Sequence, residues 1–146
     1  MEIVRATGQH LKLVAPLFDQ YRQFYKQTPD LAGARRFLRE RLEKNESVIF
    51  LALERGKGLG FTQLYPTFSS TTLRRMWILN DLFTCPDRRK TGVGTALMER
   101  ARQFGIEQGA VELMLETAKD NFPGQRLYEK LGWKRDTEFC TYHLFL

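Results

Sequence analysis

The sequence predicts a mixed α/β domain, and three features indicate this class. Segments with apolar residues at helical spacing alternate with short segments rich in β-forming residues. A glycine-containing turn at 89–94 stands between a strand-like and a helix-like segment, and a further strand-like segment follows, as in a strand–helix–strand crossover. With 146 residues, the chain has the usual size of one domain. We therefore expect a single α/β domain over residues 1–146.

The N-terminal part is expected to contain a strand and two helices. Residues 2–7 are predicted as a short strand, and residues 10–26 carry apolar side chains at helical spacing. Pro29 and Asp30 interrupt that spacing, and it resumes in a second helix that ends near Asn45.

Three strands are predicted next. Residues 47–54 and 59–66 flank a turn-forming segment at 55–58 and are predicted to form a hairpin. After a polar connection at 68–72, residues 73–84 are predicted as a strand whose apolar content indicates burial on both faces.

The C-terminal part completes the crossover. A helix is predicted over 91–108 and a strand over 110–116. Another helix is expected over 121–132, with Pro123 near its start and Gly132 at its end. Residues 133–146 are predicted as a final strand pair or one long bent strand.

Composition narrows the function classes. The net charge is +6, but much of the positive charge is interleaved with acidic residues on expected helices, and no nucleic-acid-binding signature is present. The N-terminus lacks a secretory pattern and no apolar run reaches membrane-spanning length, so we expect a cytoplasmic protein without membrane association. Cys85 and Cys140 form neither a disulfide framework nor part of a zinc pattern, so no metal is expected.

The turn Arg89-x-x-Gly92-x-Gly94 has the chemistry of an anion site. Glycines allow close backbone approach, the first turn of the following helix offers free N–H groups, and the helix dipole favours negative charge. The alternative is that these glycines serve only tight turning. The sequence has neither the lysine-containing phosphate loop of nucleoside triphosphatases nor the three-glycine dinucleotide fingerprint.

Two motifs resemble those of the GNAT superfamily of N-acetyltransferases. The first is the strand 80–84 (NDLFT) followed by the glycine turn, and the second is Asn121 followed by 127–133 (LYEKLGW). The element order also resembles this family across nearly the whole chain. The resemblance implies a mixed, mostly antiparallel central sheet flanked by helices, with a strand–helix–strand core that binds acyl-CoA. Within the superfamily, the chain is most similar to members that act on polyamines and other small amines.

The resemblance also implies a binding site for acetyl-CoA as co-substrate. Its expected residues are Leu82, Phe83, Thr84, Arg89, Lys90, Thr91, Gly92, Val93, Gly94, Thr95 and Asn121. Residues 82–84 would pair with the pantetheine arm like an added strand. In the alternative interpretation, the glycines serve only the turn, and Asn121 serves only as a helix cap.

Tyr128 and Asp81 are the catalytic candidates. By resemblance, Tyr128 would protonate the leaving thiolate, although a helical tyrosine beside leucines also suits a packing role. The attacking amine must lose a proton, and Asp81 is one candidate base, with a structural acceptor as the alternative. Some polyamine-acting relatives carry glutamate where this chain has Asn80, which favours a water relay.

Five residues are expected to line an acceptor pocket, with core packing as the alternative: Tyr21, Tyr25, Gln63, Tyr65 and Asn80. Aromatic walls suit a cation. The predicted reaction is acetyl transfer from acetyl-CoA to a primary amine of a small molecule, such as a polyamine or an amino acid. A non-catalytic acyl-CoA sensor and a protein N-acetyltransferase are the alternatives. A homodimer is compatible with the sequence.

Overall fold

The computed structural model describes residues 1–146 and groups them into two compact units, Met1–Glu116 and Thr117–Leu146. The expected single domain over 1–146 stays a prediction. No helix in the structure combines the length and the apolar character needed to cross a membrane.

The first unit is built on one five-stranded sheet in which the strands follow one another in sequence order. The strands are β1 (Glu2–Arg5), β2 (Val48–Glu54), β3 (Lys57–Ser69), β4 (Arg74–Thr84) and β5 (Leu113–Met114). The first four pair antiparallel, and β5 pairs parallel with β4 after the crossover helix α3 (Val93–Glu107). This arrangement confirms the predicted mixed, mostly antiparallel sheet and its strand–helix–strand crossover.

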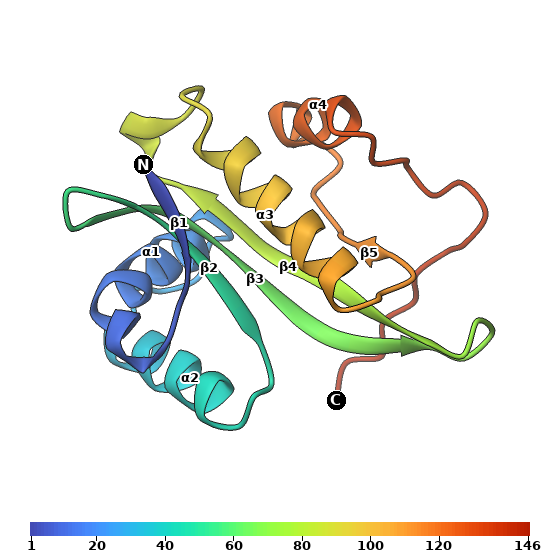
Figure 1. Ribbon diagram of the computed structural model, residues 1–146, viewed down its shortest axis with the longest axis horizontal. Helices are drawn as coiled ribbons and strands as arrows, with labels where there is room; N and C mark the ends of the chain where they lie inside the picture. Colours follow the sequence, from blue (N-terminus) through green and yellow to red (C-terminus); the bar gives the residue numbers. More distant parts are fainter. The chain divides into compact units, whose positions relative to one another are not determined.

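Helices pack on both faces of this sheet (Figure 1). The helices α1 (Leu11–Phe24) and α2 (Leu31–Glu43) lie on one face, and α3 lies on the other. Strand β2 shows how the sequence achieves this, because Ile49 and Leu51 join the core under α1 and α2. Phe50 points the opposite way, and its ring centroid lies 5.6 Å from that of Phe104 on α3.

The hairpin between β2 and β3 is tighter than predicted. Arg55 and Gly56 form a two-residue turn with positive φ angles of 50° and 74°, as the right-handed strand twist requires. Strand β3 consequently starts at Lys57, and it continues to Ser69 because that residue still pairs with Arg74 on β4. The connection predicted at 68–72 is therefore wrong at Phe68 and Ser69.

Two predicted strands differ from the structure because strands need paired neighbours. In the predicted strand 110–116, the strand is restricted to Leu113 and Met114, although Val111 and Glu112 each make one backbone hydrogen bond to β4. Residues 133–146 contain no strand, so the predicted final strand is wrong. Their apolar residues suit a strand, but no strand pairs with them, and Trp133 N instead donates to the Tyr128 carbonyl at the end of the preceding helix. The predicted helix over 121–132 is present in the second unit as α4 (Phe122–Lys130), and it ends near Gly132, whose φ is 92°.

Candidate active site

A β-bulge in β4 places the central residues of the candidate site. Gln63 pairs with Asp81, whereas the next β3 residue, Leu64, pairs with Leu79, so Asn80 is an extra residue in β4. Such a bulge bends a strand and changes the direction of its side chains. The Tyr21 hydroxyl donates a hydrogen bond to the Asn80 carbonyl at 3.2 Å. Helix α1 is thereby joined to the bulge.

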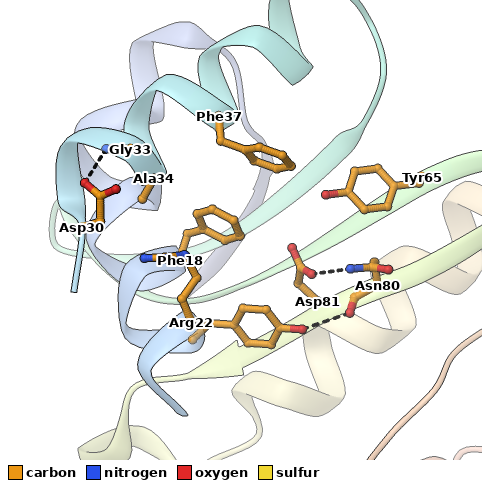
Figure 2. Close-up of a pocket in the computed structure, with 10 residues that line it drawn as sticks. Phe18, Arg22, Asp30, Gly33, Ala34, Phe37, Tyr65, Asn80 and Asp81 are labelled. Carbon is orange, nitrogen blue, oxygen red and sulfur yellow. Dashed lines mark hydrogen bonds between the residues drawn. The ribbon is translucent and has the colours of Figure 1, made fainter. Parts of the chain in front are cut away.

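The bulge opens onto a pocket of about 420 Å³. Helices α1 and α2, the residue that caps α2, and strands β3 and β4 supply its lining residues, which are Phe18, Tyr21, Arg22, Asp30, Gly33, Ala34, Phe37, Tyr65, Asn80 and Asp81. Figure 2 shows the Tyr65 hydroxyl and the Asp81 carboxylate facing the same space beside the Phe37 ring. The volume, the four aromatic rings and the few polar groups suit a small-molecule ligand.

Asp81 is a buried carboxylic acid at this pocket, with 2% of its surface exposed. The Asn80 Nδ2 donates to its Oδ1 at 2.8 Å, and the Gln63 Nε2 donates to its Oδ2 at 2.5 Å. Burial raises the pKa of Asp81, and the hydrogen bonds from Asn80, Gln63 and Tyr21 oppose that rise. A carboxylate with a raised pKa is a stronger base than an exposed aspartate, so Asp81 is suited to accept a proton.

The tyrosines around Asp81 are held in their neutral form. Burial, followed by the nearby charge of Asp81, raises the pKa values of Tyr21, Tyr25 and Tyr65. Tyr21 has one hydroxyl proton, which it donates to the Asn80 carbonyl, and Asp81 is a second acceptor close to it. The Tyr21 and Tyr65 hydroxyls at the pocket are therefore neutral hydrogen-bond donors.

The predicted anion site lies where β4 leads into α3. Gly92 has a φ of 93°, which only glycine adopts readily, and a Cβ there would meet no atom within 4 Å. The first helical hydrogen bond of α3 runs from Ala96 N to Gly92 O. The N–H groups of Val93, Gly94 and Thr95 therefore have no intrahelical acceptor, which fits the binding of phosphate oxygens.

The basic residues of this turn differ in role. The Arg88 Nη1 pairs with the Glu54 Oε2 at 2.7 Å, so Arg88 joins the turn to β2. Arg89 donates from Nε to the Thr84 carbonyl at 3.3 Å and is exposed together with Lys90. Neither Arg89 nor Lys90 forms an ion pair, so both charges can face an anionic ligand.

One edge of β4 is open beside this turn. Leu82, Phe83 and Thr84 pair with β3 on one side, whereas β5 covers the other side only at Trp77 and Ile78. Backbone groups at 82–84 on that second side can therefore pair with an extended ligand. A pantetheine arm fits this requirement.

The predicted acceptor residues fall into two groups. Tyr21, Tyr65 and Asn80 line the pocket, whereas Gln63 lies behind Asp81 and Tyr25 lies outside the lining with its ring 5.0 Å from that of Tyr21. Sequence reasoning missed the other lining residues, namely Phe18, Arg22, Asp30, Gly33, Ala34, Phe37. The signal available for them was the pair of predicted helices and the break between these helices at Pro29 and Asp30, beside which the pocket lies.

Two predicted site residues belong to the second unit. Asn121 caps α4, because its Oδ1 accepts a hydrogen bond from Gly124 N at 3.2 Å, and its Nδ2 donates to Thr117 Oγ1 at 2.9 Å. Tyr128 is half-buried on α4, and its ring centroid lies 6.4 Å from that of Trp133. Their roles toward cofactor and substrate stay predictions.

The structure has no group of three or more His, Cys, Asp or Glu residues that could hold a metal ion. Cys85 is partly buried, and burial raises the pKa of its thiol. A raised pKa lowers the fraction of reactive thiolate.

Comparison with known proteins shows the family. The model of the acetyltransferase (GNAT) family matches residues 14–133. A Bacillus subtilis (strain 168) protein named as the uncharacterized N-acetyltransferase YhfO is 47% identical over 144 residues, covering 99% of this chain and 97% of that protein. A probable acetyltransferase of Haemophilus influenzae is 31% identical, covering 88% of this chain and 97% of that protein. The crystal structure of a probable acetyltransferase matches with a TM-score of 0.95 and 44% identity, covering 100% of this chain and 98% of that one.

Proposed function

Because the chain belongs to the acetyltransferase (GNAT) family, we propose that it transfers the acetyl group of acetyl-CoA to a primary amine of a small molecule in the cytoplasm. The observation that carries this proposal is the buried Asp81 at a pocket of about 420 Å³ with aromatic walls. Such walls attract an ammonium group, and a buried carboxylate can both bind it and take its proton.

The open edge of β4 and the start of α3 form the proposed cofactor site. The free N–H groups of Val93, Gly94 and Thr95 bind the pyrophosphate, with the charges of Arg89 and Lys90 beside them. The backbone at 82–84 pairs with the pantetheine arm. Bound acetyl-CoA supplies the activated acetyl group, which is then held at the strand that carries Asp81.

Asp81 and Tyr128 divide the proton transfers in this proposal. Asp81 takes a proton from the ammonium group of the acceptor, directly or through a water molecule, and leaves a nucleophilic amine. A nitrogen–carbon bond to the acetyl group then forms while the carbon–sulfur bond breaks. The nitrogen, which becomes positively charged in this step, releases its second proton to solvent, and Asp81 returns the first proton to solvent. Tyr128 gives its hydroxyl proton to the sulfur that leaves, and solvent restores that proton.

An assay of thiol release tests the proposal. The protein is incubated with acetyl-CoA and, separately, polyamines, amino acids, aminoglycosides and peptides with free N-termini. We expect amine-dependent CoA release with at least one small amine. Release with peptides alone indicates a protein N-acetyltransferase, and CoA binding without any release indicates an acyl-CoA sensor. Either result contradicts the proposed function.

The proposed cofactor site predicts stabilisation by CoA. At a hundredfold excess over the dissociation constant, a ligand stabilises the fold by about 2.7 kcal/mol, which corresponds to a Tm rise of about 5–11 °C at this chain length. We expect a Tm shift of this size with CoA or acetyl-CoA in a thermal denaturation experiment. An equal shift with ATP or NAD would contradict a site selective for CoA.

Replacing Gly92 with aspartate should abolish that shift, because it adds a side chain and a negative charge where phosphate must approach. Gly109→Asp is a matched control. Gly109 also has a positive φ, 66°, and open space at its Cβ position, but it follows the other end of α3. Both variants carry the same kind of backbone strain, so only Gly92→Asp should lose the CoA shift. A retained shift in folded Gly92→Asp would overturn the assignment of the turn.

A further inference from the structure

A second carboxylate lines the pocket at a distance from Asp81. Asp30 belongs to the lining, and Figure 2 shows it on the opposite side of the Phe18 ring from Asp81. Its Oδ1 accepts a hydrogen bond from Gly33 N at 2.9 Å at the start of α2, and its Oδ2 makes no hydrogen bond. One oxygen of Asp30 thus holds the helix, and the other remains available.

The charges around the pocket are predominantly negative. Arg22 is the one basic lining residue, and its Nη1 pairs with the Asp19 Oδ1 at 2.8 Å. The same nitrogen donates to the Thr28 carbonyl at 3.1 Å, and Asp19 also accepts the backbone N–H of Asp30 at 3.1 Å. Asp19 therefore neutralises Arg22 and holds the loop that carries Asp30. The carboxylates of Asp30 and Asp81 remain without a cationic partner.

Between these two carboxylates the wall is apolar. The rings of Phe18 and Phe37 are stacked, with centroids 5.7 Å apart and an interplanar angle of 14°. The Phe18 ring also lies edge-on to Phe61 of the core, 6.1 Å between centroids, so the core supports this wall. A ligand that spans the pocket would place methylene groups against these rings.

From this arrangement we propose that the acceptor is a small aliphatic diamine or polyamine, with one ammonium group at Asp81 and a second at Asp30. This inference rests on the proposed function and adds to it a binding site for a second ammonium group of the acceptor. The amine at Asp81 is acetylated, and the one at Asp30 holds the other end of the chain. An amino acid places a carboxylate in a space where two carboxylates already repel it.

The first test uses the unmodified protein. kcat/KM for CoA release is measured with linear monoamines, α,ω-diamines and ω-amino acids of matched chain length. We expect the diamines to exceed monoamines of the same length, and the ω-amino acids to be the poorest substrates. Equal values for monoamines and diamines, or a preference for ω-amino acids, would overturn the inference while leaving acetyl transfer to amines intact. If none of these amines supports CoA release, the proposed function itself is refuted.

The second test removes the charge of Asp30 and keeps its helix cap. Asparagine caps helices as well as aspartate does, so Asp30→Asn should fold, and Asp30→Ser serves as a second capping variant. We expect kcat/KM for the best diamine to fall about three- to tenfold, since ion pairs at exposed carboxylates are weak. The value for monoamines should not change. Glu43→Gln is the control, because it removes one charge from an exposed site at the opposite end of α2.

These variants give distinct outcomes. A fall that is confined to diamines in both Asp30→Asn and Asp30→Ser, and absent in Glu43→Gln, supports the second ammonium site. An equal fall for monoamines and diamines assigns Asp30 to the structure of α2 alone and overturns the inference. Unchanged kcat/KM for every amine overturns it as well. Circular dichroism and Tm values establish that each variant is folded.

Discussion

Asp81→Asn is expected to lower kcat/KM for the best amine by about 10²- to 10⁴-fold, the usual contribution of a general base. The variant should still fold, because the pocket can provide a hydrogen-bond acceptor for the introduced amide. The Gln63 Oε1 is buried and has no hydrogen-bond partner, so the Gln63 side chain can turn and accept a hydrogen bond from the introduced amide. Asp136→Asn makes the same chemical change at an exposed position of the second unit and should leave kcat/KM unchanged.

The pH dependence of activity, compared between the unmodified protein and Asp81→Asn, gives an independent measurement. Since burial raises the pKa of Asp81, activity should rise with pH as this carboxyl ionises above the usual range for aspartate, and Asp81→Asn should lose that limb of the profile. The contribution of Asp81 to the free energy of unfolding should instead decrease as pH rises. A carboxyl group whose pKa is raised in the folded state stabilises the fold fully below its pKa in the unfolded state, which is about 3.9. This stabilisation is lost as pH rises through its pKa in the folded state. The Tm of Asp81→Asn relative to the unmodified protein should therefore increase with pH. A folded Asp81→Asn with normal kcat/KM would assign Asp81 to a structural role.

The glycine turn proposed as the anion site was predictable because its signal is local. Strand, turn and helix are contiguous in sequence, and a positive φ at Gly92 with free N–H groups after it follows from the glycine spacing itself. The crossover was predictable for a related reason, since a parallel strand must return over the sheet through a helix. The run of β-forming residues in β2 likewise indicated a strand, and the apolar content of β4 indicated burial on both faces.

The pocket proposed to bind the acceptor was only partly predictable, because it is assembled from distant segments. Asp30 has a sufficient local role as a helix cap, and Phe37 has one in the apolar spacing of α2, so neither pattern indicates a ligand. The bulge at Asn80 depends on the pairing of β4 with β3, and a one-residue shift in register leaves no trace in one strand's sequence. Residues 133–146 illustrate the opposite failure, in which apolar side chains suited to a strand occur without a partner strand.

Tyr128→Phe should lower kcat on the best amine by about 10²- to 10⁴-fold, because it removes the proposed proton donor to the leaving sulfur. The phenylalanine ring keeps the contact with Trp133, so folding should persist. The Tm shift with CoA should persist too, because the proposed phosphate-binding groups are unchanged. Tyr142→Phe is the matched control, since Tyr142 is 91% exposed in the same unit and its loss should change neither kcat nor the CoA shift.

The size of the Tyr128 effect depends on which step limits turnover. Thiolate is a moderate leaving group and water can partly replace the donor, so a loss near the lower end of the range agrees with the proposed role. Single-turnover measurements separate acetyl transfer from CoA release, and the deficit should appear in the transfer step. If the transfer step limits kcat and is as fast in Tyr128→Phe as in the unmodified protein, Tyr128 serves packing against Trp133. The proton that the leaving sulfur requires then comes from another donor.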